Sequence, residues 1–190
     1  MKISAIIMAS GLSERMGKNK LLLDLKDKKI YQYVYDLMDQ VDFDEIILVS
    51  SYDELLEEAE KRGYTAIYND NNIVGKSASI KLGVKNAKKD NALMFFVADQ
   101  PLLTAETVEK LIGAYKENEA ITYPRTEKRR GAPVIFPSQY REGLLGLEYD
   151  EGGMLLLKGE EKNEVTIKDV KELWDIDTYT NLEEIRKTYE

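Results

Sequence analysis

The stretch Ile3-Ser4-Ala5-Ile6-Ile7 followed by Met8–Leu21 (MASGLSERMGKNKL) decides the fold of this chain. The apolar run predicts a first, buried β-strand, and the polar segment predicts a loop that leaves the end of that strand. Glycine lets backbone N–H groups approach an anion, and the charges of Arg15, Lys18 and Lys20 can neutralise it. The segment therefore favours a polyphosphate-binding loop; the alternative is a solvated loop whose charges face water.

Two known phosphate-binding loops do not fit this segment. The Walker loop has four residues between its first glycine and its Gly-Lys pair, whereas five separate Gly11 from Gly17 here. The dinucleotide fingerprint needs three glycines, and Ser13 and Met16 occupy the second and third of those positions. A phosphate site in this loop must therefore be of another kind.

The composition is that of a globular protein with an acidic balance. Hydrophobic residues make up 43% and charged residues 33% of the 190 residues, and the formal net charge is −8. This length favours one domain, residues 1–190. The negative charge argues against a general nucleic-acid-binding surface, and no run approaches the roughly 18 to 20 apolar residues of a membrane span. We expect neither nucleic acid nor membrane as a partner and, because the chain has no cysteine, a cytoplasmic setting.

The chain also has no histidine. This excludes imidazole bases, Ser-His-Asp and Cys-His nucleophiles and most zinc sites. The side chains that remain available for catalysis are carboxylates, lysines and arginines. Phosphoryl or nucleotidyl transfer around Mg²⁺ needs little more, because its catalysis is mainly positioning and charge neutralisation.

Apolar runs alternate with helical patterns along most of the chain. Strand, helix, strand, helix at this spacing predicts right-handed crossovers and an α/β fold with a mostly parallel sheet. The expected strands are 3–7, 45–51, 65–68, 92–98, 134–136 and 163–167, and the expected helices are 29–41, 52–63, 75–88, 104–118, 139–147 and 178–189. In such a sheet, ligands bind outside the carboxyl ends of the strands.

Two acidic segments lie where a ligand is expected. Asp99 follows the apolar strand 92–98, and its carboxylate is well placed to hold Mg²⁺; the alternative is an ordinary turn with Pro101. Near the other end, Asp175 and Asp177 alternate just before a helix. Their alternatives are a solvated strand-end residue for Asp175 and a helix N-cap for Asp177.

Two further segments suit anions. Gly75–Ser79 (GKSAS) opens a helix with small hydroxyl residues and backbone N–H groups that fit an anion or nucleotide, although either serine could simply cap the helix. Arg125–Arg130 (RTEKRR) is a basic loop that could attract an anionic second substrate, or a solvated face.

Taken together, these segments resemble the nucleotidyltransferase family that includes molybdenum cofactor cytidylyltransferase and guanylyltransferase. The family opens with L-A-A-G-x-S-x-R-M-G-x-x-K, and residues 8–20 read MASGLSERMGKNK. The other matching segments, in order, are Tyr68-Asn69, Gly75–Gly83, Asp99-Gln100-Pro101, Arg130-Gly131-Ala132-Pro133 and Asp175-Ile176-Asp177-Thr178. They span nearly the whole chain.

The resemblance implies a doubly wound, Rossmann-like nucleotide-diphospho-sugar transferase fold, with helices on both faces of the sheet. It implies that the backbone of Ala9, Ser10 and Gly11 contacts the nucleotide base and that Ser79 lies near the base or ribose. The implied reaction is in-line attack by a substrate phosphate on the α-phosphorus of a nucleoside triphosphate, with release of pyrophosphate.

The catalytic residues follow from the same resemblance. Arg15 and Lys20 would hold the triphosphate, Asp99 would ligate Mg²⁺, and Asp177 would be the second carboxylate. The R-G-x-P match assigns Arg130 and Gly131 to the acceptor. The acceptor implied is a phosphorylated small molecule such as molybdopterin cofactor, and a cofactor-receiving apoenzyme is a further partner that the resemblance admits.

The segments Ala9-Ser10-Gly11 and Asp99-Gln100-Pro101 are nearer the cytidylyl than the guanylyl pattern, so CTP is the favoured donor. The chain departs from the cytidylyl pattern at Ser10, Ala132 and Met154, where alanine, histidine and arginine are usual. The alternatives are therefore transfer from GTP, a sugar or alcohol phosphate as acceptor, or a catalytically silent nucleotide- or cofactor-binding protein.

Overall fold

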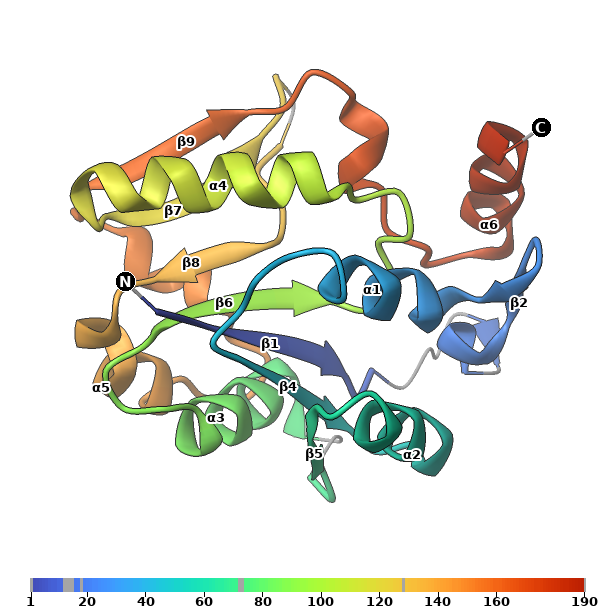
Figure 1. Cartoon of the computed structure of the whole chain (residues 1–190), viewed down its shortest axis with the longest axis horizontal. Coiled ribbons are helices and arrows are strands. Elements are labelled where there is room, and N and C mark those ends of the chain that lie inside the picture. Colours follow the sequence, from blue (N-terminus) through green and yellow to red (C-terminus); the bar gives the residue numbers. More distant parts are fainter. Residues whose placement is uncertain (1, 12–15, 18, 72–73, 128, 190) are drawn as a thin grey trace.

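A mostly parallel sheet forms the centre of the molecule. The computed structural model describes residues 2–11, 16–17, 19–71, 74–127 and 129–189. Within these residues seven strands form one sheet in the order β5-β4-β1-β6-β8-β7-β9 (Figure 1). The strands are β1 (Ile3–Ala9), β4 (Glu45–Ser50), β5 (Thr65–Tyr68), β6 (Ala92–Val97), β7 (Ile121–Arg125), β8 (Val134–Phe136) and β9 (Lys162–Thr166).

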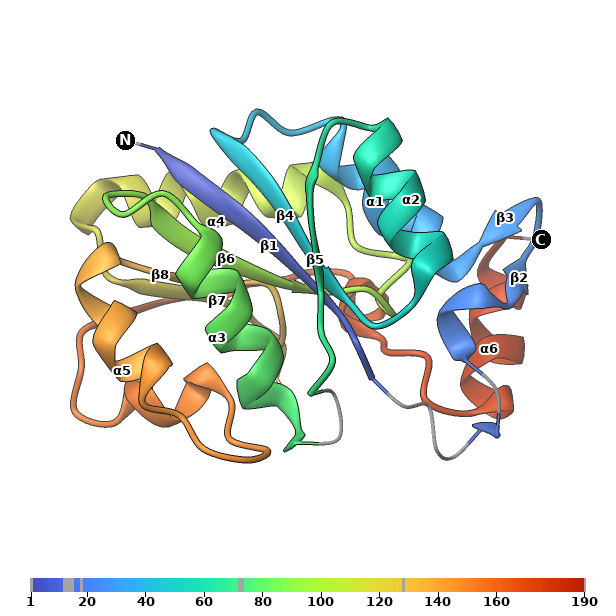
Figure 2. The ribbon, with the colours of Figure 1, turned by 90° about the horizontal axis from the view of Figure 1, so that it is seen from below.

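Helices cover both faces of this sheet. The helices are α1 (Ile30–Met38), α2 (Asp53–Lys61), α3 (Lys76–Asn86), α4 (Ala105–Asn118), α5 (Arg141–Leu145) and α6 (Tyr179–Arg186). One core cluster holds the buried side chains of α1, α2, α4 and α6, and the other holds those of α3 and α5. Figure 2 shows α3 and α5 in front of the sheet and α4 behind it. The predicted α/β fold class is confirmed.

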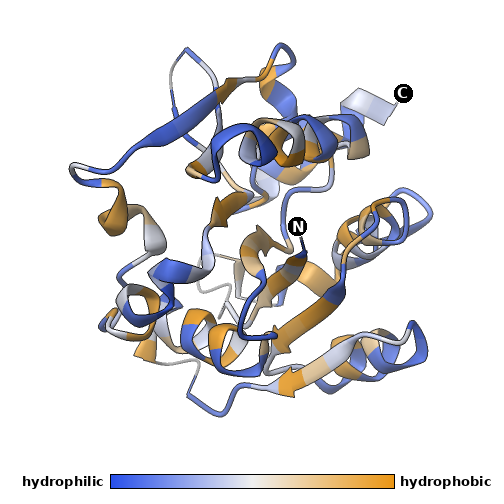
Figure 3. Ribbon diagram, turned by 60° about the vertical axis from the view of Figure 1, so that its left-hand side comes forward, coloured by the Kyte–Doolittle hydropathy of each residue, from blue (hydrophilic) through white to orange (hydrophobic). Residues whose placement is uncertain are grey.

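The apolar run of β1 is explained by this two-sided cover. Ile3, Ala5 and Ile7 pack into the core beneath α1, α2 and α4, whereas Ile6 packs into the core beneath α3. A parallel strand buried on both faces reads as continuous apolar sequence, not as an alternation. Figure 3 shows the central strands as hydrophobic and the outer faces of the helices as largely hydrophilic.

The topology places a ligand edge between β1 and β6. The chain runs from β1 to β4 and β5 on one side and then returns to β6 on the other side of β1. Met8 of β1 pairs with Val97 of β6, so the segments that follow these strands leave the sheet side by side. In open α/β sheets the crevice at such a reversal of strand order is where ligands bind.

Several details differ from the sequence expectation. β8 runs antiparallel to both β6 and β7, whereas β7 and β9 are parallel. A two-stranded hairpin of β2 (Asp24–Leu25) and β3 (Lys28–Lys29) was not expected, because pairs of two residues carry no periodicity. Short 3₁₀ turns cover Lys20–Leu22, Ser138–Tyr140, Gly153–Leu157, Val170–Leu173 and Lys187–Tyr189.

The helix boundaries follow local capping. The hydroxyl of Thr104 accepts from the Thr107 N–H at 3.3 Å and caps α4, as expected. The cap of α6 is Thr178, with Asn181 completing a reciprocal capping box, so Asp177 is not the cap. The expected helix 139–147 splits into a 3₁₀ turn and the short α5, which ends at Gly146. No helix in the described part of the chain is both long and apolar enough to span a membrane.

Candidate active site

The two acidic segments lie side by side at the ligand edge. The N–H of Ile176 donates to the carbonyl oxygen of Asp99 at 3.0 Å, and the Ile176 side chain is fully buried. Thr178 and Asn181 then fix the start of α6, and the Asn181 side-chain oxygen also accepts from the Asp177 N–H at 3.3 Å. Residues from distant parts of the sequence thus bring Asp99 and Asp177 together.

Lys20 joins these two carboxylates. Its Nζ lies 2.5 Å from Oδ2 of Asp99 and 2.8 Å from Oδ1 of Asp177. Lys20 sits in the 3₁₀ turn Lys20–Leu22, which Asn19 caps by accepting from the Leu21 N–H. The side chain of Lys20 is 13% exposed and that of Asp99 17%, whereas Asp177 is 48% exposed. The site therefore has one face toward solvent.

Burial and pairing shift both of the inner groups. Burial raises the pKa of Asp99 above its ordinary value, and the neighbouring Lys20 charge opposes that rise. Burial disfavours the charge of Lys20, but Asp99 and Asp177 outweigh it and raise the pKa of Lys20. Lys20 is therefore cationic at neutral pH, and it balances negative charge that the two aspartates bring to one place.

The donor set fits a divalent cation. Carboxylate oxygens are the ligands that Mg²⁺ and Mn²⁺ prefer, and Mg²⁺ sites in phosphate chemistry use one or two carboxylates together with water and substrate phosphates. Asp99 and Asp177 already share a cation, the ammonium of Lys20. Among the described residues there is no group of three or more acidic side chains that forms a complete protein cage. A site of two aspartates that a phosphate completes is consistent with both observations.

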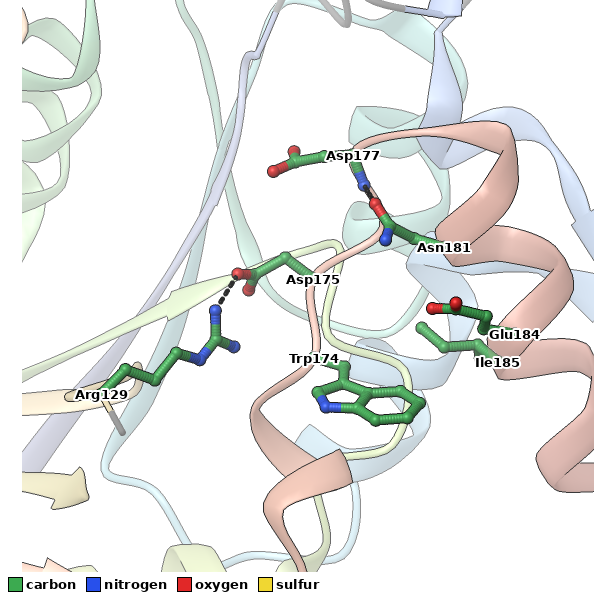
Figure 4. Close-up of a pocket in the computed structure, with 7 residues that line it drawn as sticks. All are labelled: Arg129, Trp174, Asp175, Asp177, Asn181, Glu184 and Ile185. Atoms are coloured by element: carbon green, nitrogen blue, oxygen red, sulfur yellow. Dashed lines mark hydrogen bonds and ion pairs between the residues drawn. The ribbon is translucent and has the colours of Figure 1, made fainter. Parts of the chain in front are cut away.

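A third acidic side chain, Asp175, has other partners. Asp175 accepts from Gln100 Nε2 at 2.7 Å and from Arg129 Nη1 at 3.1 Å, so each of its oxygens has a partner. Figure 4 shows Asp175 beside Arg129, with Asp177 and Trp174 at the same cavity. This cavity is about 250 Å³ in volume. Asp175 is thus neither a solvated strand-end residue nor a member of the pair around Lys20.

The end of β1 is tied to β4 by side-chain hydrogen bonds. Ser50 donates to the Ala9 carbonyl at 3.1 Å, and the Tyr52 hydroxyl donates to the Gly11 carbonyl at 2.9 Å. Ser10 is buried and donates its hydroxyl to the Val49 carbonyl at 3.2 Å. The serine at this position therefore acts as a tether to β4, and its side chain turns away from the ligand edge.

The Ser79 hydroxyl and the first N–H groups of α3 already have hydrogen-bond partners within the protein. Asn69 Nδ2 donates to the Ser79 hydroxyl at 3.1 Å, and both side chains are buried. Neither serine of the GKSAS segment caps the helix; the cap is Gly75, with φ 110°. The N–H groups of Lys76 and Ser77, which the sequence offered to an anion, donate instead to the Asp150 carboxylate and the Tyr149 carbonyl.

Arg130 and Gly131 line a larger cavity of about 310 Å³, which also includes Lys76, Gln100, Arg129 and Asp175. The guanidinium of Arg130 lies 3.4 Å from Glu164 Oε1 and 5.4 Å from the ring centroid of Tyr123, so it points toward β7 and β9. A Cβ at Gly131 would lie 2.9 Å from Leu173 Cδ1, so a larger residue there would require the buried Leu173 side chain to shift. The neighbouring Arg129 has its guanidinium at Asp175 instead.

Arg15 lies outside the described residues, and so does Lys18. The expected triphosphate role of Arg15 therefore stays a prediction. Sequence reasoning missed the Gln100–Asp175–Arg129 chain of contacts. The sequence does contain a signal for these contacts. Gln100 directly follows Asp99, and Asp175 lies two positions before Asp177, so each acidic segment carries a second polar side chain.

The strand order and the helices on both faces of the sheet are those of the nucleotide-diphospho-sugar transferase fold. At its ligand edge the ammonium of Lys20 lies between the carboxylates of Asp99 and Asp177. The chain belongs to the MobA-like NTP transferase domain family, whose sequence model matches residues 5–165. It is accordingly a nucleotidyltransferase, and the predicted family resemblance is confirmed.

Two curated relatives illustrate the range of the family. The purine catabolism protein PucB of Bacillus subtilis is 28% identical over 200 residues, covering 96% of this chain and 95% of PucB. A probable molybdenum cofactor guanylyltransferase of Aquifex aeolicus is 30% identical over 125 residues, covering 64% of this chain and 57% of the relative.

A solved structure shares the whole fold. Rv0371c of Mycobacterium tuberculosis, crystallised as a complex with manganese, superposes with a TM-score of 0.81 at 19% identity, covering 99% of this chain and 100% of that one. At this identity the likeness extends to the fold.

Proposed function

We propose that this chain transfers CMP from CTP to a phosphorylated small molecule, molybdopterin cofactor being the favoured acceptor, in a Mg²⁺-dependent reaction that releases pyrophosphate. The observation that supports it most is the ammonium of Lys20 between Asp99 and Asp177, at 2.5 and 2.8 Å. Two carboxylates that already share one cation, the ammonium of Lys20, lie together at the edge where the strand order reverses. We further propose that residues 1–190 act as one domain in the cytoplasm.

The chemistry asks for positioning more than for a proton acceptor. An oxygen of the acceptor phosphate attacks the α-phosphorus of CTP and forms a new P–O bond. The bond from the α-phosphorus to its bridging oxygen breaks, and pyrophosphate leaves with the electron pair. Because the attacking phosphate is already anionic, no imidazole base is needed, which fits a chain without histidine.

Each residue of the site has a part in this proposal. Asp99 and Asp177 hold the metal ion, which supplies charge neutralisation to the triphosphate when it is bound. Lys20 is released from the two carboxylates to neutralise the charge that develops on the leaving pyrophosphate. Arg15 holds the triphosphate beside it. The solvent-facing side of Asp177, 48% exposed, gives the ion and the nucleotide a route of entry.

The choice of CTP rests on the segments Ala9-Ser10-Gly11 and Asp99-Gln100-Pro101, which are nearer the cytidylyl than the guanylyl pattern. Since the Ser10 hydroxyl is used by the Val49 carbonyl, contacts to the base fall to the backbone of Ala9–Gly11. Ser79 keeps its hydroxyl proton for the nucleotide while it accepts from Asn69. GTP is the alternative donor, because relatives of the chain are named as guanylyltransferases.

The acceptor is assigned to the larger cavity, where Arg130 and Gly131 lie. A relative named as a probable molybdenum cofactor guanylyltransferase supports a molybdopterin-type acceptor. The alternative acceptor is a sugar or alcohol phosphate. If the product is a finished cofactor, an apoenzyme that receives it is the expected protein partner.

The test measures pyrophosphate release with CTP, GTP, ATP and UTP, each with Mg²⁺ and with or without molybdopterin cofactor. We expect release with CTP that requires both Mg²⁺ and the acceptor. Pyrophosphate release with GTP and with none of the other three nucleotides would overturn the assignment of CTP as donor. Release with glucose 1-phosphate but not with molybdopterin would overturn the assignment of molybdopterin as acceptor. Nucleotide binding without pyrophosphate release from any pair would favour the silent binding protein and contradict the proposal.

A further inference from the structure

Arg129, Asp175 and Gln100 form a connected chain beside the two-aspartate site. Gln100 Nε2 donates to one oxygen of Asp175 at 2.7 Å, and Arg129 Nη1 donates to the other at 3.1 Å. Gln100 is 3% exposed, so it is a fixed donor that holds the Asp175 carboxylate in one orientation. The carboxylate in turn fixes one end of the Arg129 guanidinium.

This chain of contacts stands at the junction of the two cavities. Arg129 and Asp175 line the smaller cavity together with Asp177, and both also line the larger cavity. Figure 4 shows the residues that line the smaller cavity, with Arg129 directed toward Asp175. A ligand that reaches from the larger cavity toward Asp177 therefore passes the Arg129 guanidinium.

Arg129 differs from the other arginines of its loop. Arg125 and Arg130 both pair with Glu164 of β9, whereas Arg129 pairs with Asp175. Arg129 is 44% exposed, and an ion pair so open to solvent contributes little to stability by itself. A guanidinium has five N–H donors in a planar fork that matches phosphate, and Asp175 uses its Nη1 end. The other edge of the fork suits an oxyanion.

The wall of the larger cavity is mainly apolar. Phe95, Phe136, Ile80 and Met154 contribute to it, and Gly153 brings backbone against the Phe136 ring, where a Cβ would lie 2.7 Å from Cζ. Apolar lining cannot hold a phosphate, so that task falls to the charged donors of the cavity, Lys76, Arg129 and Arg130, of which Arg130 is paired with Glu164.

We propose that Arg129 binds the phosphate of the acceptor and that Asp175 and Gln100 position Arg129 for this. The inference rests on the proposed nucleotidyl transfer and names the side chain that recognises the acceptor phosphate. Asp175 is a positioning residue, since it acts through Arg129.

The first test compares the effect of Arg129 variants on KM for molybdopterin with their effect on KM for CTP. Arg129→Gln should raise KM for molybdopterin at least about tenfold, the loss expected for a charged hydrogen bond, and leave KM for CTP unchanged. Arg129→Lys should recover part of this loss, because it keeps the charge without the fork. Arg125→Gln is the matched control and should change neither constant. A change in KM for CTP alone would overturn the inference.

The positioning role is tested by combining variants. Asp175→Asn should raise KM for molybdopterin in the wild-type background and have no further effect in the Arg129→Gln background. Independent effects that multiply in the double variant would contradict a role through Arg129.

A binding measurement separates failure of this inference from failure of the proposed reaction. Trp174 is the single tryptophan and lines the cavity beside Arg129, so its fluorescence reports occupancy without turnover. Phenyl phosphate should quench it saturably in the wild type and in Arg125→Gln, and at least about tenfold more weakly in Arg129→Gln. An Arg129→Gln variant that binds phenyl phosphate as tightly as the wild type would overturn the inference even if the enzyme proves active.

Discussion

The backbone N–H of Ile176 donates to the carbonyl oxygen of Asp99 at 3.0 Å, and this contact sets two distant acidic segments in register. Their side chains then meet in pairs. Asp99 and Asp177 meet at Lys20, and Gln100 meets Asp175 beside Arg129. One hydrogen bond thus aligns the cation-binding pair with the neighbouring pair that we assign to the acceptor.

Asp99→Asn should lower Mg²⁺-dependent turnover by at least about a hundredfold, the loss typical when a group that stabilises transition-state charge is removed. The fold should be preserved, because the amide is isosteric and Asp177 still pairs with Lys20. Asp42→Asn, at an exposed aspartate before β4, is the control and should be fully active. The measurements are pyrophosphate release and thermal unfolding by circular dichroism; full activity in Asp99→Asn would rule out its role.

Lys20→Met should separate metal binding from catalysis. In the absence of nucleotide the Lys20 ammonium competes with a divalent ion for Asp99 and Asp177. Removing it should tighten Mn²⁺ binding by about fivefold or more, since a unit charge about 4 Å away is worth about 1 kcal/mol in high dielectric. Turnover should fall nevertheless.

Free Mn²⁺ measured by electron paramagnetic resonance checks the binding half of this prediction. Lys29→Met, which removes an ion pair with Glu54 at the start of α1, should leave Mn²⁺ affinity unchanged. Weaker Mn²⁺ binding in Lys20→Met would contradict the competition.

Asn181→Ala should affect both stability and the metal requirement. Asn181 accepts from the N–H groups of Asp177 and Thr178 and completes the capping box of α6. Its loss should cost about 0.5–2 kcal/mol of the free energy of unfolding and raise the Mg²⁺ concentration for half-maximal activity. Asn86→Ala, at an exposed position near the end of α3, is the matched control. A destabilised variant with an unchanged Mg²⁺ requirement would show that the cap does not position Asp177.

Two glycines inside helices should respond in opposite directions to alanine. A Cβ on Gly83 of α3 would lie 2.5 Å from Ile6 Cγ2, so Gly83→Ala should destabilise the fold by about 1–3 kcal/mol. Gly113 of α4 has open space around a Cβ, and Gly113→Ala should stabilise by about 0.5–1 kcal/mol. Urea unfolding of both variants measures these changes in the free energy of unfolding. The same change in both variants would mean that α3 does not pack this closely on β1.

The sequence predicted the parts of the fold that local pattern determines. The apolar runs of β1 and β6 mark strands buried on both faces, and Thr104 marks the start of α4. The direction of β8 was beyond such reasoning, because three residues carry no sign of which neighbour they pair with. Helix ends differed by up to three residues, as for α1, which ends at Met38 where the pattern predicted 41.

The sequence could predict which residues belong to the site, but not which of them contact one another. Asp99 and Asp177 were expected at one edge, but the placement of Lys20 between them depends on tertiary packing across most of the chain. The alanine-to-serine departure at position 10 has a local cause, the hydrogen bond from Ser10 to Val49, that a single sequence does not reveal. The sequence does not separate the roles of Arg129 and Arg130, since both lie in the same basic run; their different partners, Asp175 and Glu164, do.

Transfer of CMP from CTP to an acceptor at the Lys20 site can be followed by the position of a radioactive label. With [α-³²P]CTP, Mg²⁺ and molybdopterin, label should appear in a larger, acceptor-bound product, and its appearance should require Asp99. With [γ-³²P]CTP, label should appear only in pyrophosphate. Label from the α position found only in free CMP, or in product formed equally well by Asp99→Asn, would contradict CMP transfer at this site.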